Sequence, residues 1–260
     1  MSPPSATPTV PPRVLAHVFW RSLFLQAAWN RRGMQNLGFA YAIEPALRVL
    51  YPEPPRYRAA LSRHLGFFNC HPYMAAAIVG GAIHHEERVA VGAEPEALPV
   101  RYKEALQGPL AALGDGFFWT ALRPFFGALA ALGALTLGAP AIVAALVLYN
   151  AVHLALRLGL FLAGHRLGDA VVGEIARLAL PVAAGRLRVA GVALCGFAAA
   201  AVLVRGDVAG GAGAAALAGI AAGAGYVALA RGARLLPTAY VATLAGVAAA
   251  ALAGRIHGGL

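Results

Sequence analysis

Two polar side chains, Asn69 and His71, lie in an apolar stretch of the sequence that covers residues 65–81. Burying such groups costs free energy unless partners or water satisfy their hydrogen bonds. Pro72 follows them and ends or kinks a helix at this point, which frees backbone carbonyl groups. Together these groups donate and accept hydrogen bonds, which suits an uncharged polyol such as a sugar. A capped turn at a membrane interface explains the same residues.

A second apolar stretch, residues 106–126, contains Asp115 between two glycines and Trp119 one turn later. The carboxylate can accept hydrogen bonds from sugar hydroxyls, and the indole ring can lie flat against a sugar. A helix-capping aspartate and an aromatic-belt tryptophan are the structural alternative. Broken apolar segments that bury polar groups are typical of transporter substrate sites. We therefore expect Asn69, His71 and Asp115 to lie inside the membrane boundary, either near one another or near the interface with a partner.

A third polar cluster contains Gln26, Trp29, Asn30, Gln35 and Asn36. A solvated face of an amphipathic helix would have the same composition. We retain Gln35 and Asn36 as substrate-binding candidates because their amides can donate to and accept from hydroxyl groups.

Further along the chain, His153 and Arg157 are four residues apart, so they share one face of a strongly apolar helix. They either pair with an acid elsewhere or lie at the membrane interface. Cys70 and Cys195 are far apart in apolar surroundings and are expected to be small buried hydrophobic residues. The sequence has no catalytic triad, Walker motif, Rossmann glycine pattern or zinc signature, so we expect no catalytic residue, cofactor or metal.

The composition indicates an integral membrane protein. The chain has 260 residues, of which 60% are hydrophobic and only 12% are charged, about half the charged fraction of soluble domains. The net charge of +10 comes mostly from arginines that are scattered singly or in pairs. Nucleic-acid binders instead carry a basic stripe on a soluble fold, so we expect membrane lipid and no nucleic acid as a partner.

The fold class predicted from these patterns is an all-α integral membrane protein, a multi-helix bundle with broken or re-entrant helices. We expect three parts: a disordered Pro-rich tail at residues 1–12, amphipathic and re-entrant helices at 13–105, and a transmembrane helical region at 106–260. The middle part is expected to include an aqueous excursion at 84–104.

In the first half we expect helices at residues 13–30, 34–50 and 56–70, the second of them interrupted by Pro45. In the second half the candidate membrane helices are 125–138, 140–162, 171–184, 187–204, 211–230 and 235–254. Paired arginines at 186 and 188 indicate a cytoplasmic loop between two of them.

Four motifs in the chain resemble the IID component of mannose-family phosphotransferase system (PTS) permeases. They are SLFLQAAWN and MQNLGFAY at residues 22–41, HLGFFNCHPYM at 64–74, GPLAALGDGFFWTALRP at 108–124, and NAVHLALR at 150–157. They occur in the order that the family has, and together they are specific although none would be so alone.

The resemblance implies a transporter subunit rather than an enzyme. Such a subunit forms, with a homologous IIC membrane subunit, the pathway for a hexose, and cytoplasmic IIA and IIB components deliver the phosphate. The phosphoryl-carrying residues belong to those partners. The resemblance further implies a multi-pass protein of the bacterial inner membrane in a hetero-oligomer.

One departure from the family pattern occurs directly after Asn30. The family usually has a Tyr-Glu pair there, whereas this chain has Arg31, Arg32 and Gly33. A cation thus replaces an acid, and either the substrate specificity has shifted or the chain assembles without ordinary transport. The alternative function is therefore a permease-derived regulatory or docking protein that moves no sugar.

Overall fold

The computed structural model describes residues 9–205, which are mostly helical and contain no strand in that range. The elements are α1 (Pro12–Ser22), α2 (Asn36–Leu50), α3 (Pro54–His64), α4 (Ala75–Ala90), α5 (Leu98–Gly114), the π-helix η1 (Asp115–Leu122), α6 (Arg123–Leu137), α7 (Ala139–Leu167), the 3₁₀-helix η2 (Gly168–Ala170), α8 (Val171–Arg177) and α9 (Leu180–Arg205). The helical fold class predicted from the sequence is confirmed.

The chain divides into two compact units. Among the described residues, one unit contains residues 9–122 together with Leu148–Arg186, and the other contains Arg123–Val147 and residues 187–205. Two helical stretches among residues 9–205, Leu98–Leu137 and Ala139–Ala198, are long and apolar enough to cross a membrane.

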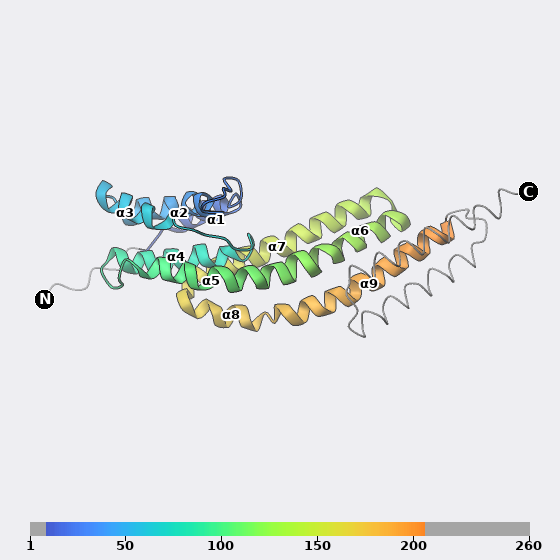
Figure 1. Ribbon diagram of the computed structural model, residues 1–260. Coiled ribbons are helices and arrows are strands. Elements are labelled where there is room, and N and C mark those ends of the chain that lie inside the picture. The colour runs from blue at the N-terminus through green and yellow to red at the C-terminus, as the bar shows by residue number, and fades with distance from the viewer. Residues whose placement is uncertain (1–8, 206–260) are drawn as a thin grey trace, which may run out of the picture. The chain divides into compact units, whose positions relative to one another are not determined.

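Helices α1 and α2 pack side by side in the first unit (Figure 1). Val18 of α1 and Leu25 after it are buried. The approach is close at Gly38, where a Cβ atom would overlap the carbonyl group of Leu25. The helix predicted over residues 13–30 ends earlier in the structure, at Ser22, and turns follow up to residue 28.

Pro45 does not interrupt α2, contrary to the prediction. Proline lacks the N–H that would bond to the carbonyl group four residues earlier, here that of Tyr41. Arg21 of α1 donates to that carbonyl at 3.1 Å and also pairs with Glu44 at 2.8 Å. The packing of α1 on α2 thus supplies the hydrogen bond that the proline removes.

The Glu86 carboxylate of α4 connects three elements. Arg63 of α3 donates to both of its oxygens at 2.8 Å, and His64 contacts Oε1 at 2.8 Å. The Tyr51 hydroxyl, just after α2, donates to Oε2 at 2.6 Å. Burial by itself would raise the pKa of Glu86, but the hydrogen bonds from Arg63 and His64 outweigh it and lower the pKa to about 2.

The polar excursion predicted at residues 84–104 is different in the structure, because α4 continues to Ala90 and α5 begins at Leu98. Three polar residues of α4, His85, Glu86 and Glu87, are buried and have partners. His85 contacts Glu94 at 2.9 Å, and Glu87 accepts a hydrogen bond from the backbone N–H of Val10 at 2.7 Å. The pattern of polar and apolar residues in the sequence does not indicate which residues pair in this way.

Helix α4 also packs closely against the part of α7 that belongs to the same unit. A Cβ atom at Gly80 would overlap the carbonyl group of Phe161, and one at Gly164 would overlap that of Ala77. Small residues at facing positions let helix backbones approach within contact distance. Glycines in the sequence therefore fix this helix pair.

The second unit contains α6, the start of α7 and most of α9. Gly138, with φ +81°, joins α6 to α7, as a left-handed turn residue requires. The loop predicted at the Arg186–Arg188 pair is wrong, because α9 runs unbroken through it. The candidate spans 211–230 and 235–254 lie outside the described residues.

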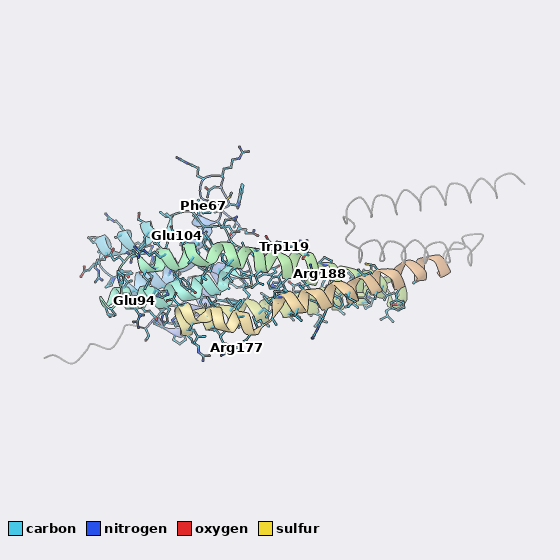
Figure 2. All side chains as sticks on the ribbon, turned by 60° about the horizontal axis from the view of Figure 1, so that its bottom comes forward. Phe67, Glu94, Glu104, Trp119, Arg177 and Arg188 are labelled. Atoms are coloured by element: carbon cyan, nitrogen blue, oxygen red, sulfur yellow. The ribbon has the colours of Figure 1, made fainter. Side chains whose placement is uncertain are left out.

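We predict that Arg63→Met destabilises the protein strongly, whereas Arg177→Met does not. The first variant leaves the fully buried Glu86 without its main charge partner, which costs about 3–5 kcal/mol. Arg177 pairs with Glu174 on the exposed surface of α8 (Figure 2), where such a pair contributes about 0–1 kcal/mol. Thermal unfolding in detergent measures both, and equal melting temperatures for the variants would contradict the prediction.

We also predict that acid destabilises the fold through Glu86. Its pKa falls from 4.5 to about 2 on folding, so the unfolded state binds more protons in this window. The stability is fully present above pH 4.5 and is lost as the pH falls toward 2. Glu86→Gln should lower stability at neutral pH and flatten the loss of stability in that window, as melting at a series of pH values would show.

Candidate functional site

An aromatic and histidine cluster forms around the 69–74 segment, which lies between α3 and α4. The His71 ring stacks on Phe118 of η1, with centroids 4.9 Å apart and planes at 13°. The ring centroid of Trp119 lies 4.9 Å from that of His71 and 5.9 Å from that of Tyr73. The first unit therefore brings together two of the motifs found in the sequence.

A third motif joins this cluster from α7. His153 stacks on the Tyr73 ring at 4.3 Å and 8°, and the hydroxyl groups of Tyr149 and Tyr73 are 3.4 Å apart. The Arg157 guanidinium lies 5.8 Å from the centre of the Tyr73 ring. Tyr73 is thus the residue around which His71, His153 and the aromatic rings are arranged.

The local sequence explains how η1 reaches His71. A π-helix of eight residues, Asp115–Leu122, continues α5 directly. Its wider turn changes the register of the side chains relative to an α-helix, and π-helical turns are frequent at functional sites. Gly114 at the junction faces the His71 side chain, where a Cβ atom would overlap Cβ and Cγ of the histidine. A side chain larger than glycine would push η1 away from the cluster.

The hydrogen-bonding state of His71 follows from its contacts. The Tyr73 backbone N–H donates to Nδ1 at 3.2 Å, while Nε2 is buried and has no partner among the described residues. Burial, followed by the nearby Arg157 charge, lowers the pKa of His71 to about 4. The imidazole is therefore neutral at physiological pH.

His153 and Arg157 of α7 are also buried. His153 Nε2 contacts Asn150 Oδ1 at 3.0 Å, and its Nδ1 has no partner among the described residues. Arg157 donates through Nη2 to the carbonyl group of Ser22, the last residue of α1. A cation at a helix C-terminus is favourable because of the helix dipole, so Arg157 attaches α7 to α1.

Two predicted substrate-binding residues, Gln35 and Asn36, hold the 65–70 segment in place. The Gln35 amide donates to the Cys70 carbonyl at 2.9 Å and accepts from the Cys70 N–H at 3.1 Å. Asn36 donates to the Leu65 carbonyl at 2.6 Å and accepts from the Asn30 amide at 2.9 Å. Both amides are therefore occupied within the chain and position the backbone that leads to His71.

The other predicted residues lie at the edge of the cluster. Asn69 is exposed, and its backbone N–H donates to Gln107 Oε1 at 2.9 Å. Asp115 is exposed and directly follows the glycine that packs on His71. Trp119 is 36% exposed and lies at the surface of the helix that continues α5 (Figure 2). His71 is the buried member of the predicted set within the cluster.

Sequence reasoning did not assign Tyr73, Tyr149 or Phe118 to the site. The signal for Tyr73 was its place directly after the Asn69–Pro72 motif. Tyr149 had none that distinguishes it from an aromatic-belt residue. Among residues 9–205 no group of three or more His, Cys, Asp or Glu side chains could hold a metal ion. The cluster can pack rings against the apolar face of a sugar and can hydrogen-bond hydroxyl groups.

This helical membrane fold and its motifs place the chain in a known class of transport proteins. The family profile "PTS system mannose/fructose/sorbose family IID component" matches residues 10–207. The chain therefore belongs to the IID family of these phosphotransferase systems, as its four motifs predicted.

Several curated relatives are similar over part of the chain. The mannose-specific EIID component of Escherichia coli K12 is 43% identical over 142 residues, 54% of this chain and 50% of the relative. The sorbose-specific EIID component of Klebsiella pneumoniae is 35% identical over 162 residues, 62% of this chain and 59% of the relative. The chain thus spans about half the length of the mannose-specific relatives that it matches.

Solved structures agree with this assignment. The cryo-electron microscopy structure of the mannose transporter ManYZ in complex with microcin E492 contains a chain that is 34% identical, with a TM-score of 0.59 over 75% of this chain and 70% of that one. A second membrane protein structure is also 34% identical, with a TM-score of 0.64 over 75% of this chain and 71% of that one.

We predict that Gly114→Ala disrupts the cluster and that Gly116→Ala is tolerated. A methyl group at residue 114 would overlap His71 and the Met74 side chain, whereas residue 116 has open space around its Cβ position. Overpacking of this kind costs about 1–3 kcal/mol. Thermal melting and tryptophan fluorescence of a variant that keeps only Trp119 report the change. Equal melting temperatures and equal Trp119 fluorescence in the two variants would show that the close contact of Gly114 with His71 does not position η1.

Proposed function

We propose that this chain is the IID membrane subunit of a PTS sugar permease. With a homologous IIC subunit it forms the pathway for a hexose, which a IIB component phosphorylates during uptake. The observation that carries the proposal is the family match over residues 10–207. The cluster of buried histidines and aromatic rings supports it, because such groups bind the faces and hydroxyls of sugars.

The proposed partners follow from this role. The IIC chain is the membrane partner in a hetero-oligomer, IIA and IIB carry the phosphoryl group, and lipid surrounds the apolar helices. The setting is the bacterial inner membrane, which the protein crosses several times. We assign no phosphoryl-carrying residue to this chain, so the phosphotransferase chemistry belongs to IIA and IIB.

We propose Asn69, His71, Asp115 and Trp119 as substrate-facing residues, and Gln35 and Asn36 as the residues that position the backbone leading to His71. Asp115 and Trp119 are open at the surface of the isolated chain. The IIC subunit would cover them in the assembly and exclude water from the bound sugar. A carboxylate in such surroundings makes stronger hydrogen bonds to hydroxyls than a neutral group does.

The function is tested by uptake in cells that lack other hexose transporters. The chain is co-expressed with its IIC and IIB partners, and accumulation of radiolabelled mannose, glucose, fructose and sorbose as their phosphates is measured. Co-purification of the chain with IIC reports assembly in the same cells. Assembly without accumulation of any of these sugars would overturn the transport function and favour a docking role.

We predict that Asp115→Asn lowers uptake roughly 10- to 150-fold, the cost of removing a charged hydrogen-bond partner. Asp169→Asn is the matched control. The Asp169 side chain, in η2, is 77% exposed, and its ion pair with His85 Nε2 is long, at 3.7 Å. Asp115 lies inside the continuous helix formed by α5 and η1, so it caps no helix N-terminus. Equal uptake by the two variants at matched membrane abundance would therefore mean that Asp115 is only a surface residue of this helix.

A further inference from the structure

Two buried imidazole nitrogens in the cluster lack a hydrogen-bond partner within residues 9–205. They are Nε2 of His71 and Nδ1 of His153, and both side chains are more than nine-tenths buried. A buried polar atom without a partner costs about 1–3 kcal/mol. Both rings contact Tyr73, so the two unsatisfied atoms belong to one site.

The hydrogen on His71 is placed by the backbone. A backbone N–H can only donate, and that of Tyr73 points at Nδ1 from 3.2 Å. Nδ1 is therefore the acceptor, and the neutral ring carries its hydrogen on Nε2. The unsatisfied atom of His71 is a hydrogen-bond donor.

The other ring has the opposite arrangement. Asn150 Oδ1 lies 3.0 Å from His153 Nε2 and can only accept, so Nε2 carries the hydrogen. The lone pair of Nδ1 is then unsatisfied, and this atom of His153 is an acceptor. The cluster thus offers one donor and one acceptor.

We propose that His71 and His153 form a donor–acceptor pair that binds hydroxyl groups of an unphosphorylated sugar. A hydroxyl group both donates and accepts hydrogen bonds. One hydroxyl can therefore bond both nitrogens, or two hydroxyls on neighbouring carbons can bond one nitrogen each. His153 then becomes a specificity-determining residue next to the site residues already named. This inference rests on the proposed function, because it specifies how the same site recognises its substrate.

The surrounding rings suit this ligand. Tyr73 and Phe118 cover the flat faces of the imidazoles, and Trp119 lies at the surface side of His71. A sugar must displace an aromatic side chain to reach the nitrogens, since neither atom is exposed to solvent. Trp119 is the partly exposed ring that contacts His71, so it is the side chain that has to be displaced on that side.

The test uses variants that keep or remove one hydrogen-bonding atom. His71→Gln keeps an N–H group near the Nε2 position, and His153→Asn keeps an oxygen near the Nδ1 position. His71→Leu and His153→Leu remove both. His17→Leu, on the exposed part of α1, is the control. Each variant is purified with IIC, and binding of mannose, glucose, fructose, their monodeoxy analogues and their 6-phosphates is measured by calorimetry.

We expect each leucine variant to bind the preferred hexose roughly 5- to 150-fold more weakly, and the amide variants to recover most of the loss. One monodeoxy analogue should bind the unmodified assembly more weakly than the preferred hexose does, by a similar factor. Its affinity should not fall further when the matching histidine is replaced by leucine. That coupling identifies the hydroxyl that each histidine binds.

Four results would overturn the inference. Equal weakening for every analogue would mean that the histidines only support the fold, and unchanged binding would mean that the nitrogens bind ordered water only. Tighter binding of the 6-phosphates would assign the site to an anion attracted by Arg157. If the unmodified assembly binds and takes up no hexose, the proposed function itself fails and this inference fails with it.

Discussion

The buried carboxylate of Glu86 is the interaction on which the first unit depends. A charge with no exposed surface is stable only if donors surround it, and here Tyr51, Arg63 and His64 supply them. The network extends to α5, because Lys103 donates to the His64 carbonyl at 3.2 Å while lying 4.6 Å from the Phe39 ring. Removing one member leaves another buried group unpaired, so the residues act as a unit.

This constraint explains which predictions from the sequence were right and which were not. The helical class and the approximate positions of α2, α6 and α7 follow from the apolar composition of those segments. Residues 84–90 were taken for a solvated segment because they are polar, although Glu86 and His85 are buried. Partners far apart in sequence decide burial here, and a single sequence does not reveal the pairing of Arg63 with Glu86. Likewise, Arg21 of α1 donates to the Tyr41 carbonyl, which Pro45 leaves without a backbone donor.

The candidate site was only partly predictable for the same reason. His71 was identified because a polar side chain beside a proline in an apolar stretch is costly to bury without a hydrogen-bond partner. Its neighbours Phe118 and Trp119 depend on η1, and nothing in the sequence distinguishes a π-helix from a further turn of α5. Gln35 and Asn36 have the side chains of a sugar site, yet their amides are occupied by backbone groups. Amide chemistry alone does not separate recognition of a ligand from support of a loop.

The departure at Arg31 and Arg32 can now be placed in the structure. Both residues are exposed at the tip of a turn in which Asn30 Oδ1 accepts hydrogen bonds from the backbone N–H groups of Arg32 and Gly33. A Cβ atom at Gly33 would overlap the Asn36 amide. The change from an acid to two cations therefore alters the charge of an outer surface, whereas His71 lies beyond the amides that anchor this turn. Any effect of the substitution on sugar recognition must act through whatever contacts that surface in the assembly, because the exposed turn that carries Arg31 and Arg32 is separated from His71 by the amides of Gln35 and Asn36.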